Sequence, residues 1–391
     1  MIVVGIDVAS EKHDYTIVSS TGQIFNKHSI TIKNSIEGIK KLHNDIKTFC
    51  GAMKDSNVRI GLESTGIYHL SILNQLLELG YSVMVINPSL INSLKKSKDV
   101  SPAKNDNLDS KAVCQFLLDP FIDFNPYTIK SYHIESLKSL SRERFRLIKE
   151  RNKTKQAIDR YITILFPEYK SLFSNIYGES SINILSKYPS PKSILKSRNS
   201  SLSELIHGKC TVDVLTLKEK AKHSIGIDNE YIEFELKSYI QKLKFQNESI
   251  EKYDSKIKEY VLKSYPNLIT IPGISFITAG LIIGEIGDIS KFSNADKLMK
   301  FSGLAPIVYE SGKYKAQNTK PSKMGSKYLR YALFQSANII WQNDKTFSDY
   351  FTKKANEGKH YYVILGHIEK KLIRIIHSLM KSGNEFTPQT R

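Results

Sequence analysis

Residues 231–265 constrain the fold most, because apolar side chains recur there at alternating spacings of four and three residues. This heptad pattern predicts a long helix with one seam, and such a seam needs a partner helix. At 391 residues the chain is also too long for one ordinary core. We therefore expect a long helical coiled-coil middle between two other domains. The predicted seam consists of Leu236, Ile240, Leu243, Asn247, Ile250, Asp254, Ile257 and Val261.

A second helix of similar length is predicted over residues 133–166, which contain few helix breakers. It offers apolar residues at compatible spacing, namely Leu140, Leu147, Ile158, Tyr161 and Leu165. Two arrangements stay open: an antiparallel pair closed by residues 167–230, or pairing between protomers. Residues 167–230 are rich in Ser, Lys and Pro and show no clear motif.

The N-terminal residues alternate between strand and helix patterns. Residues 2–8, 14–18 and 23–32 read as three consecutive strands, followed by a helix near 35–50, a strand at 58–63, a helix at 67–79, a strand at 81–87 and helical segments to about 118. This order is typical of a ribonuclease-H/RuvC-like α/β layer. We predict three domains: this layer at 1–125, the helical region at 126–265, and a mainly α-helical domain at 266–391.

The net charge of +18 is not spread evenly along the chain. Residues 1–125 contain 13 basic and 13 acidic residues, residues 126–265 contain 26 and 17, and residues 266–391 contain 18 and 9. Each later part therefore carries +9, which favours a neutral chemical domain followed by polyanion-binding parts. One face of the helix over 133–166 is basic, and it is either solvated or follows a nucleic-acid backbone. The candidate contacts on it are Arg142, Arg146, Lys149 and Lys153.

The cysteines and the apolar stretches point to a soluble protein of a reducing compartment. Cys50, Cys114 and Cys210 lie far apart and form no CxxC pair, which argues against a disulfide framework and a structural zinc site. The most apolar stretch, residues 277–289, is too short and too broken by glycine to span a bilayer. We expect a cytoplasmic protein with no membrane partner.

Four carboxylates have positions that suit a metal site. Asp7 and Glu63 each end an apolar strand, and these strands would lie side by side in the predicted sheet. Asp106 and Asp109 lie three apart at the start of a helix and so share one face. Each residue alone is more often a turn or a helix cap. Four carboxylates together repel one another unless a divalent cation is bound, and oxygen ligands suit Mg²⁺ or Mn²⁺.

Ser311 opens a lysine-rich stretch near the other end of the chain. The basic residues after it are Lys313, Lys315, Lys320, Lys323, Lys327 and Arg330, opposed by a single acid, Glu310. A phosphate backbone would be drawn to this stretch, so Ser311 is a candidate nucleophile toward DNA. Tyr309 is a rival nucleophile, and an ordinary turn is the simplest alternative. Upstream, residues 268–289 predict either a helix-hairpin-helix-like element that binds phosphate or a buried helical hairpin.

These motifs together resemble a family of bacterial insertion-sequence transposases, typified by the Piv DNA invertase and the bridge-RNA-guided recombinases. The N-terminal likeness lies in GIDVAS at 5–10, LESTG at 62–66 and KNDNLDSKA at 104–112. The C-terminal likeness lies in IPGISFITAGLIIGEIGDISKF at 271–292, FSGLAP at 301–306, YESG at 309–312 and SKMGSKYLRYAL at 322–333. Asn105 replaces the family's usual threonine but leaves the acidic positions intact.

The resemblance implies a role for each candidate. Asp7, Glu63, Asp106 and Asp109 would form the family's DEDD metal site, and Ser311 would match its serine nucleophile. Cutting and rejoining of DNA would then proceed through a covalent phosphoserine link. The two sites would cooperate between protomers of a homo-oligomer, a dimer or a tetramer, and a bridge RNA would select donor and target DNA.

Other functions predict other sequence features. An actin-like or sugar-kinase ATPase would need a second phosphate loop and an adenosine motif, and the sequence shows neither. A Holliday-junction resolvase would use the carboxylates but not Ser311 in its basic surroundings. A non-catalytic nucleic-acid-binding protein would have no reason to place four acids where they repel its ligand. A transposase or Piv-like invertase accounts for both halves of the chain.

Overall fold

The computed structural model of the chain describes residues 1–64, 66–92, 106–206, 212–305, 310–311, 314–315, 322 and 325–388. It forms two compact units, Met1–Tyr132 and His133–Arg391, which are described separately. The three predicted domains remain a prediction beside this division. Among the described helices, none combines the length and the hydropathy that crossing a bilayer requires.

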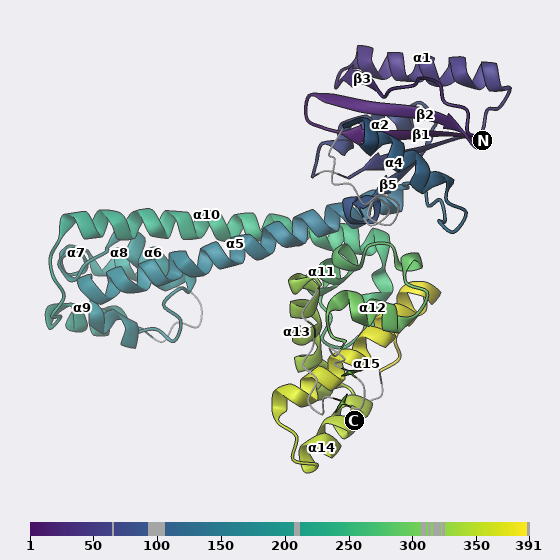
Figure 1. The fold of residues 1–391 in the computed structure, drawn as a ribbon. Coiled ribbons are helices and arrows are strands. Elements are labelled where there is room, and N and C mark those ends of the chain that lie inside the picture. The colour runs from purple at the N-terminus through teal and green to yellow at the C-terminus, as the bar shows by residue number, and fades with distance from the viewer. Residues whose placement is uncertain are drawn as a thin grey trace. The chain divides into compact units, whose positions relative to one another are not determined.

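The N-terminal unit is built on one mixed sheet (Figure 1). Its strands are β1 (Ile2–Val8), β2 (Lys12–Ser19), β3 (Ile30–Lys33), β4 (Val58–Glu63) and β5 (Ser82–Ile86), in the order β3-β2-β1-β4-β5. β1, β2 and β3 pair as an antiparallel meander, whereas β4 and β5 are added in parallel on the other side of β1. The predicted α/β layer is therefore confirmed.

One strand is shorter than predicted. Of the segment 23–32, only residues from Ile30 onward join the sheet, and Ile24 makes a single bridge to Val18. Residues 26–29 are Asn, Lys, His and Ser, so no apolar side chain in this run could face the core. The strand forms only where Ile32 can be buried.

Helices cover both faces of the sheet. α1 (Ile36–Met53) begins at Ser35, whose hydroxyl accepts a hydrogen bond from the Gly38 amide at 3.3 Å. Together with α2 (His69–Glu78) it packs against the face that carries Ile2, Val4 and Ile6. α4 (Asp106–Leu118) packs against the opposite face, where Val3 lies with Val113 and Cys114.

In the C-terminal unit, α5 (Ile129–Leu165) and α10 (Glu230–Ser264) form an antiparallel pair within one chain. Contacts run in opposite sequence directions: Arg144 pairs with Asp254, Arg151 donates to Asn247, and Tyr161 lies 5.5 Å from Tyr239 between ring centroids. The first of the two predicted arrangements is thus found. The two polar residues of the seam, Asn247 and Asp254, accept hydrogen bonds from arginines of α5. Gln246, next to Asn247, is buried.

The sequence predicted no motif for residues 167–230, and the described parts of this range, 167–206 and 212–230, form small helices around their own apolar cluster. The elements are η1 (Pro167–Ser171), α6 (Glu179–Lys187), α7 (Pro191–Lys196), α8 (Asn199–Ser203) and α9 (Val214–Lys222). Phe166, Tyr169 and Leu217 are buried there against Leu236 and Ile240 of α10. These residues therefore cap one end of the helix pair.

The rest of this unit is mainly helical, as predicted. Its elements are η2 (Pro266–Thr270), α11 (Phe276–Ile286), η3 (Ile289–Lys291), α12 (Ala295–Ser302), β6 (Glu310–Ser311), β7 (Tyr314–Lys315), α13 (Lys327–Asn343), α14 (Lys345–Asn356) and α15 (Tyr361–Ser382). α11 is buried along most of its length, against α13, α15 and the near end of α5. The helix predicted within residues 268–289 is therefore part of the apolar core.

Candidate functional site

Asp7 and Glu63 lie near the ends of neighbouring strands, at the same level of the sheet. β1 and β4 are parallel, and Ile6 pairs with Leu62, so the next residue of each strand is one of the two carboxylates. Glu63 is buried, and Asp7 is partly exposed. The predicted proximity of these strand ends is therefore found in the structure.

The two carboxylates also lie on one face of the sheet. A Cβ at Gly5 would meet Ser110 and Cys114 of α4, and a Cβ at Gly61 would meet Val113 and Leu117. Because side chains alternate along a strand, Asp7 and Glu63, each two residues further on, belong to the same α4-covered face.

The start of α4 lies toward these strand ends. The carbonyl of Ser110 lies over Gly5, and one turn later Cys114 Sγ is 4.0 Å from the carbonyl oxygen of Val3. α4 thus runs opposite to β1, and its first turn, which begins at Asp106 and contains Asp109, is directed toward Asp7 and Glu63. Asp109 is half-buried, whereas the side chain of Asp106 lies outside the described residues.

Asp14 is a further acid on this face that the sequence pattern did not single out. It lies opposite Asp7 in the antiparallel pairing of β1 with β2. It is 7% exposed and accepts a hydrogen bond from Thr31 Oγ1. The alternation in β2 is the signal that could have identified it, because Thr16, two residues on, contacts Ser110 of α4 at 2.8 Å.

No group of three or more His, Cys, Asp or Glu side chains within the described part of the chain is arranged to hold a metal ion. The predicted set includes Asp106, whose side chain is not described. The structure thus brings two of the four carboxylates onto adjacent strands and directs the first turn of α4 toward them.

Ser311 lies in a short antiparallel hairpin. It pairs with Tyr314, and Glu310 pairs with Lys315. Tyr309, Lys313, Lys320 and Lys323 lie outside the described residues, as do the side chains of Ser311 and Lys315. Lys327 begins α13, and its ammonium lies 5.2 Å from the centroid of the Tyr328 ring. Arg330 donates hydrogen bonds to two backbone carbonyls.

The basic residues of α5 differ in what they contact. Arg142 binds the buried carboxylate of Glu285, and Arg146 binds Glu143 and Glu150 on its own helix. Lys149 is exposed, and its ammonium lies 4.9 Å from the centroid of the Phe145 ring. Lys153 is also exposed. Lys149 and Lys153 are therefore the better placed of the four for an external phosphate.

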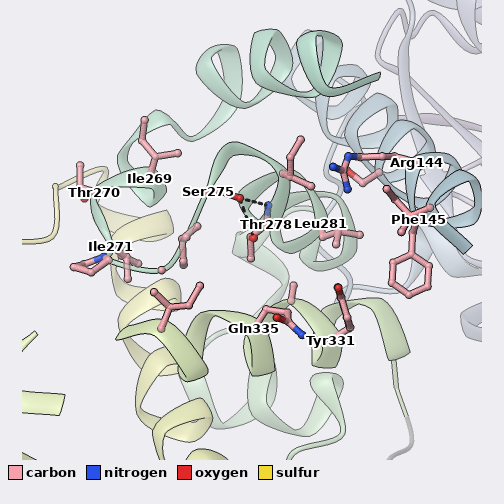
Figure 2. Close-up of a pocket in the computed structure, with 18 of the residues that line it drawn as sticks. Arg144, Phe145, Ile269, Thr270, Ile271, Ser275, Thr278, Leu281, Tyr331 and Gln335 are labelled. Atoms are coloured by element: carbon pink, nitrogen blue, oxygen red, sulfur yellow. Dashed lines mark hydrogen bonds between the residues drawn. The ribbon is translucent and has the colours of Figure 1, made fainter. Parts of the chain in front are cut away.

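A cavity of about 820 Å³ lies between α5, the turn before α11, and α13 (Figure 2). Arg144, Lys149 and Asn152 line it from α5, and Tyr331 and Gln335 line it from α13. No carboxylate is found among its described lining residues.

The turn before α11 forms another wall of this cavity. Gly273 has φ +90°, and a Cβ there would lie 2.9 Å from the carbonyl oxygen of Ser336 in α13. Ser275 caps α11 by accepting a hydrogen bond from the Thr278 amide at 3.2 Å. The cavity therefore combines the ammonium of Lys149, the guanidinium of Arg144 that also binds Asp254, a helix N-terminus, and the rings of Phe145 and Tyr331, 5.1 Å apart. Such walls can accept a phosphate together with a base.

Comparison with known proteins identifies the family. A family model described as transposase, of the IS110 DEDD type, matches residues 4–167, and one described as transposase of the IS116/IS110/IS902 family matches residues 265–352. The chain is 20% identical to the insertion element IS116 protein of Streptomyces clavuligerus, over 99% of this chain and 96% of that protein. It is 24% identical to the transposase for insertion sequence element IS1328 of Yersinia enterocolitica, over 84% and 85% of the two chains.

More limited similarities complete the comparison. The pilin gene-inverting protein of Moraxella bovis is 32% identical over 30% of this chain and 37% of its own. A Thermus thermophilus RuvC structure in complex with a Holliday junction substrate aligns over 30% of this chain and 93% of that chain, with 13% identity and a TM-score of 0.22. The two family matches and the nearly full-length relatives show that the chain belongs to the IS110-type DEDD transposase family and is therefore a transposase enzyme.

Proposed function

We propose that this transposase cuts and rejoins DNA with a carboxylate site made of Asp7, Glu63, Asp106 and Asp109 and with Ser311 as its nucleophile. The observation that carries the proposal is the pairing of β1 with β4, because it places Asp7 and Glu63 on adjacent strand ends of one face. The first turn of α4 supports it, since that turn is directed to the same edge of the sheet.

The proposed site suits a divalent metal. All four donors are carboxylates, and hard oxygen ligands of this kind fit Mg²⁺ or Mn²⁺. Such an ion, when bound, would polarise a phosphodiester and stabilise charge on the attacking and leaving oxygens. The chain's own contribution is to hold Glu63 in a buried position at the end of β4, next to the strand that carries Asp7.

The proposed reaction at Ser311 is a phosphoryl exchange. Its Oγ forms an ester bond to phosphorus while the bond from phosphorus to one deoxyribose oxygen breaks. The serine hydroxyl gives up its proton, and the leaving oxygen takes one up. Attack on the phosphoserine by a deoxyribose hydroxyl reverses these changes and rejoins DNA, so the exchange uses neither an oxidant nor a nucleotide cofactor.

The nucleic-acid contacts are part of the same proposal. The lysines that follow Ser311, with Lys149 and Lys153 of α5, would bind phosphates, and the cavity at the α11 turn would accept one nucleotide of a strand. We further propose that a bridge RNA selects the DNA sequences, so that the protein holds backbones while base pairing reads sequence.

DNA inversion is the second candidate function. It is favoured by the 32% identity to the Moraxella bovis pilin gene-inverting protein, within the part of the chain that matches. The DNA around the gene distinguishes the two. A single invertible segment beside the gene would support inversion, whereas element-like ends with a non-coding segment of several hundred bases would support RNA-guided transposition.

The test uses a supercoiled plasmid that carries the element's junction and target, incubated with the protein, its RNA and Mg²⁺. We expect a covalent protein–DNA adduct whose attachment maps to Ser311 by mass spectrometry. Ser311→Ala should abolish the adduct. Asp7→Asn should abolish it too while salt-sensitive DNA binding persists. An adduct that survives Ser311→Ala, or that maps to Tyr309, would show that another residue is the nucleophile.

A further inference from the structure

The residues on the two sides of the serine segment, which is defined as residues 306–321, contact each other directly. The Ser322 amide donates to the carbonyl of Ala305 at 3.0 Å. Arg330 Nη1 donates to the carbonyls of Ser302 and Gly325, at 3.2 and 3.1 Å. These contacts fix the positions at which the serine segment joins the helical unit.

Glycine at position 325 permits this close approach. Gly325 has φ +139°, and a Cβ there would lie 2.2 Å from the backbone oxygen of Phe301. A larger residue would push the two flanks apart, because the atom it meets belongs to the backbone and cannot rotate away.

Ser326 connects the downstream flank to a buried acid. Its Oγ accepts a hydrogen bond from the Leu329 amide at 3.2 Å and so caps α13. The same hydroxyl donates to Glu285 Oε2 at 2.6 Å. Glu285 belongs to α11 and is only 5% exposed. One hydroxyl therefore sets both the start of α13 and its contact with α11.

Arg142 of α5 completes the network. Its Nε and Nη2 donate to the two oxygens of Glu285, at 2.5 and 2.9 Å. Burial raises the pKa of Glu285, but the hydrogen bonds from Arg142 and Ser326 outweigh burial and hold that pKa below its usual range. Arg142 also lies over the ring of Tyr328 in α13, 4.9 Å from the centroid. A single ionised carboxylate thus joins α5, α11 and α13.

We propose that Glu285, Arg142 and Ser326 are positioning residues that set the direction in which the serine segment presents Ser311 to DNA. This inference rests on the proposed role of Ser311. Stability alone does not account for the network, because a buried ion pair is often no more stabilising than apolar residues of similar size. Directional bonds to three helices, however, fix the angle of α13 beside the serine segment.

Single-turnover kinetics of adduct formation test this role. Ser326→Ala removes the hydroxyl, and we expect the rate constant for adduct formation to fall about tenfold or more, because small misplacements of a reacting group are costly. The Kd for the same DNA should not change. Ser326→Thr retains a hydroxyl and should restore most of the rate. Arg374→Ala, which removes an exposed cation at 3.5 Å from Asp296, is the control and should react like the wild type.

Limited proteolysis gives a readout that does not depend on activity. In Ser326→Ala and Arg142→Lys, we expect faster trypsin cleavage after Lys313 or Lys315, with an unchanged unfolding midpoint by circular dichroism. Arg142→Lys keeps the positive charge but cannot donate to both oxygens of Glu285 in the same way. It therefore provides the test if Ser326→Ala folds poorly.

The outcomes separate the two proposals. If the wild type forms no adduct on Ser311, the proposed nucleophile is wrong, and proteolysis alone decides the role of the network. If the wild type does form it and both variants match it in rate and in cleavage, Glu285, Arg142 and Ser326 do not position Ser311.

Discussion

Gly5 and Gly61 lie opposite each other on β1 and β4, and both face α4. At Gly5 a Cβ would lie 2.2 Å from the carbonyl oxygen of Ser110, and at Gly61 it would lie 2.7 Å from a side-chain methyl of Val113. The absence of two side chains lets α4 lie directly on the sheet. This close packing is what brings the first turn of α4 to the level of Asp7 and Glu63.

Alanine at these glycines should therefore have unequal effects. Gly5→Ala meets backbone atoms, which cannot rotate away, so we expect a loss of about 3 kcal/mol or more in the free energy of unfolding. Gly61→Ala meets side-chain ends that can shift, and a smaller loss of about 1 kcal/mol is expected. Gly51→Ala in α1 has no atom within 4 Å and should stabilise the fold by about 0.5–1 kcal/mol. Urea unfolding measures all three, and equal effects at Gly5 and Gly61 would contradict this account.

Glu369 of α15 gives the C-terminal unit a pH dependence. Burial raises the pKa of Glu369 from 4.5 to about 7, although Lys370 and Arg330 act in the opposite direction. The folded state therefore holds this proton more tightly than the unfolded state. The contribution of this proton to the free energy of unfolding is fully present below about pH 4.5 and is lost as the pH rises to about 7.

Glu369→Gln should remove this dependence. Near pH 4.5 the variant and the wild type should have the same free energy of unfolding. Between pH 4.5 and 7 the variant should become the more stable of the two, and the difference should reach up to ~3 kcal/mol above pH 7. Denaturant unfolding at several pH values measures the difference. A constant difference between the two proteins over this range would show that Glu369 is ionised in the folded state throughout.

At the scale of elements, the two ends of α5 belong to apolar cores, and its middle carries exposed lysines. Near its start it joins the apolar core of the C-terminal helices through Ile134 and Leu137, and near its end it packs Ile158 and Ile162 with the small helices α6–α9. Between these ends Lys149 and Lys153 are exposed, one of them on the cavity beside the α11 turn. The middle of α5 is thus the part that is free to contact a ligand.

Replacing these lysines should weaken nucleic-acid binding without changing its sequence preference. For Lys149→Ala and Lys153→Ala, we expect lower affinity for all DNA sequences. The slope of log K against log salt should decrease by about one for each phosphate that the variant no longer binds. Lys252→Ala, an exposed lysine of α10, is the matched control. Fluorescence anisotropy at several salt concentrations measures the slope. A weaker affinity that does not depend on salt would argue against phosphate binding by these lysines.

For the whole molecule, the carboxylates and the serine belong to different compact units, Met1–Tyr132 and His133–Arg391. The proposed reaction needs both at one phosphodiester. A homo-oligomer could supply them from different protomers, and mixing two inactive variants distinguishes this arrangement from one within a single chain.

We expect Asp7→Asn and Ser311→Ala to be inactive alone and to regain part of the adduct yield when coexpressed. In a mixed dimer whose sites form between protomers, one site combines an intact Asp7 with an intact Ser311. If each site forms within one chain, no site is intact and no adduct appears. Each variant mixed with itself is the control, and the oligomeric state is checked by light scattering.

Local patterns in the sequence predicted much of the fold. Local strand patterns identified β1, β2, β4 and β5. The heptad seam identified α10, and the scarcity of helix breakers identified α5, because such patterns depend on neighbours a few residues apart. The shortened β3 and the small helices over residues 167–230 did not follow from such patterns. Ile32 of β3 is buried in the core of the N-terminal sheet, and the apolar residues of the small helices are buried with α5 and α10.

The candidate site, like the fold, was predicted in part from local sequence and depends in part on distant contacts. The sequence alone determined which acids end strands and which serine lies in a basic stretch, since both are properties of adjacent residues. Only the tertiary structure decided that Gly5 and Gly61 admit α4, that Asp14 lies opposite Asp7, and that Arg142 binds Glu285. Strand register and helix packing join residues far apart in the chain, and no local spacing encodes which distant partner is chosen.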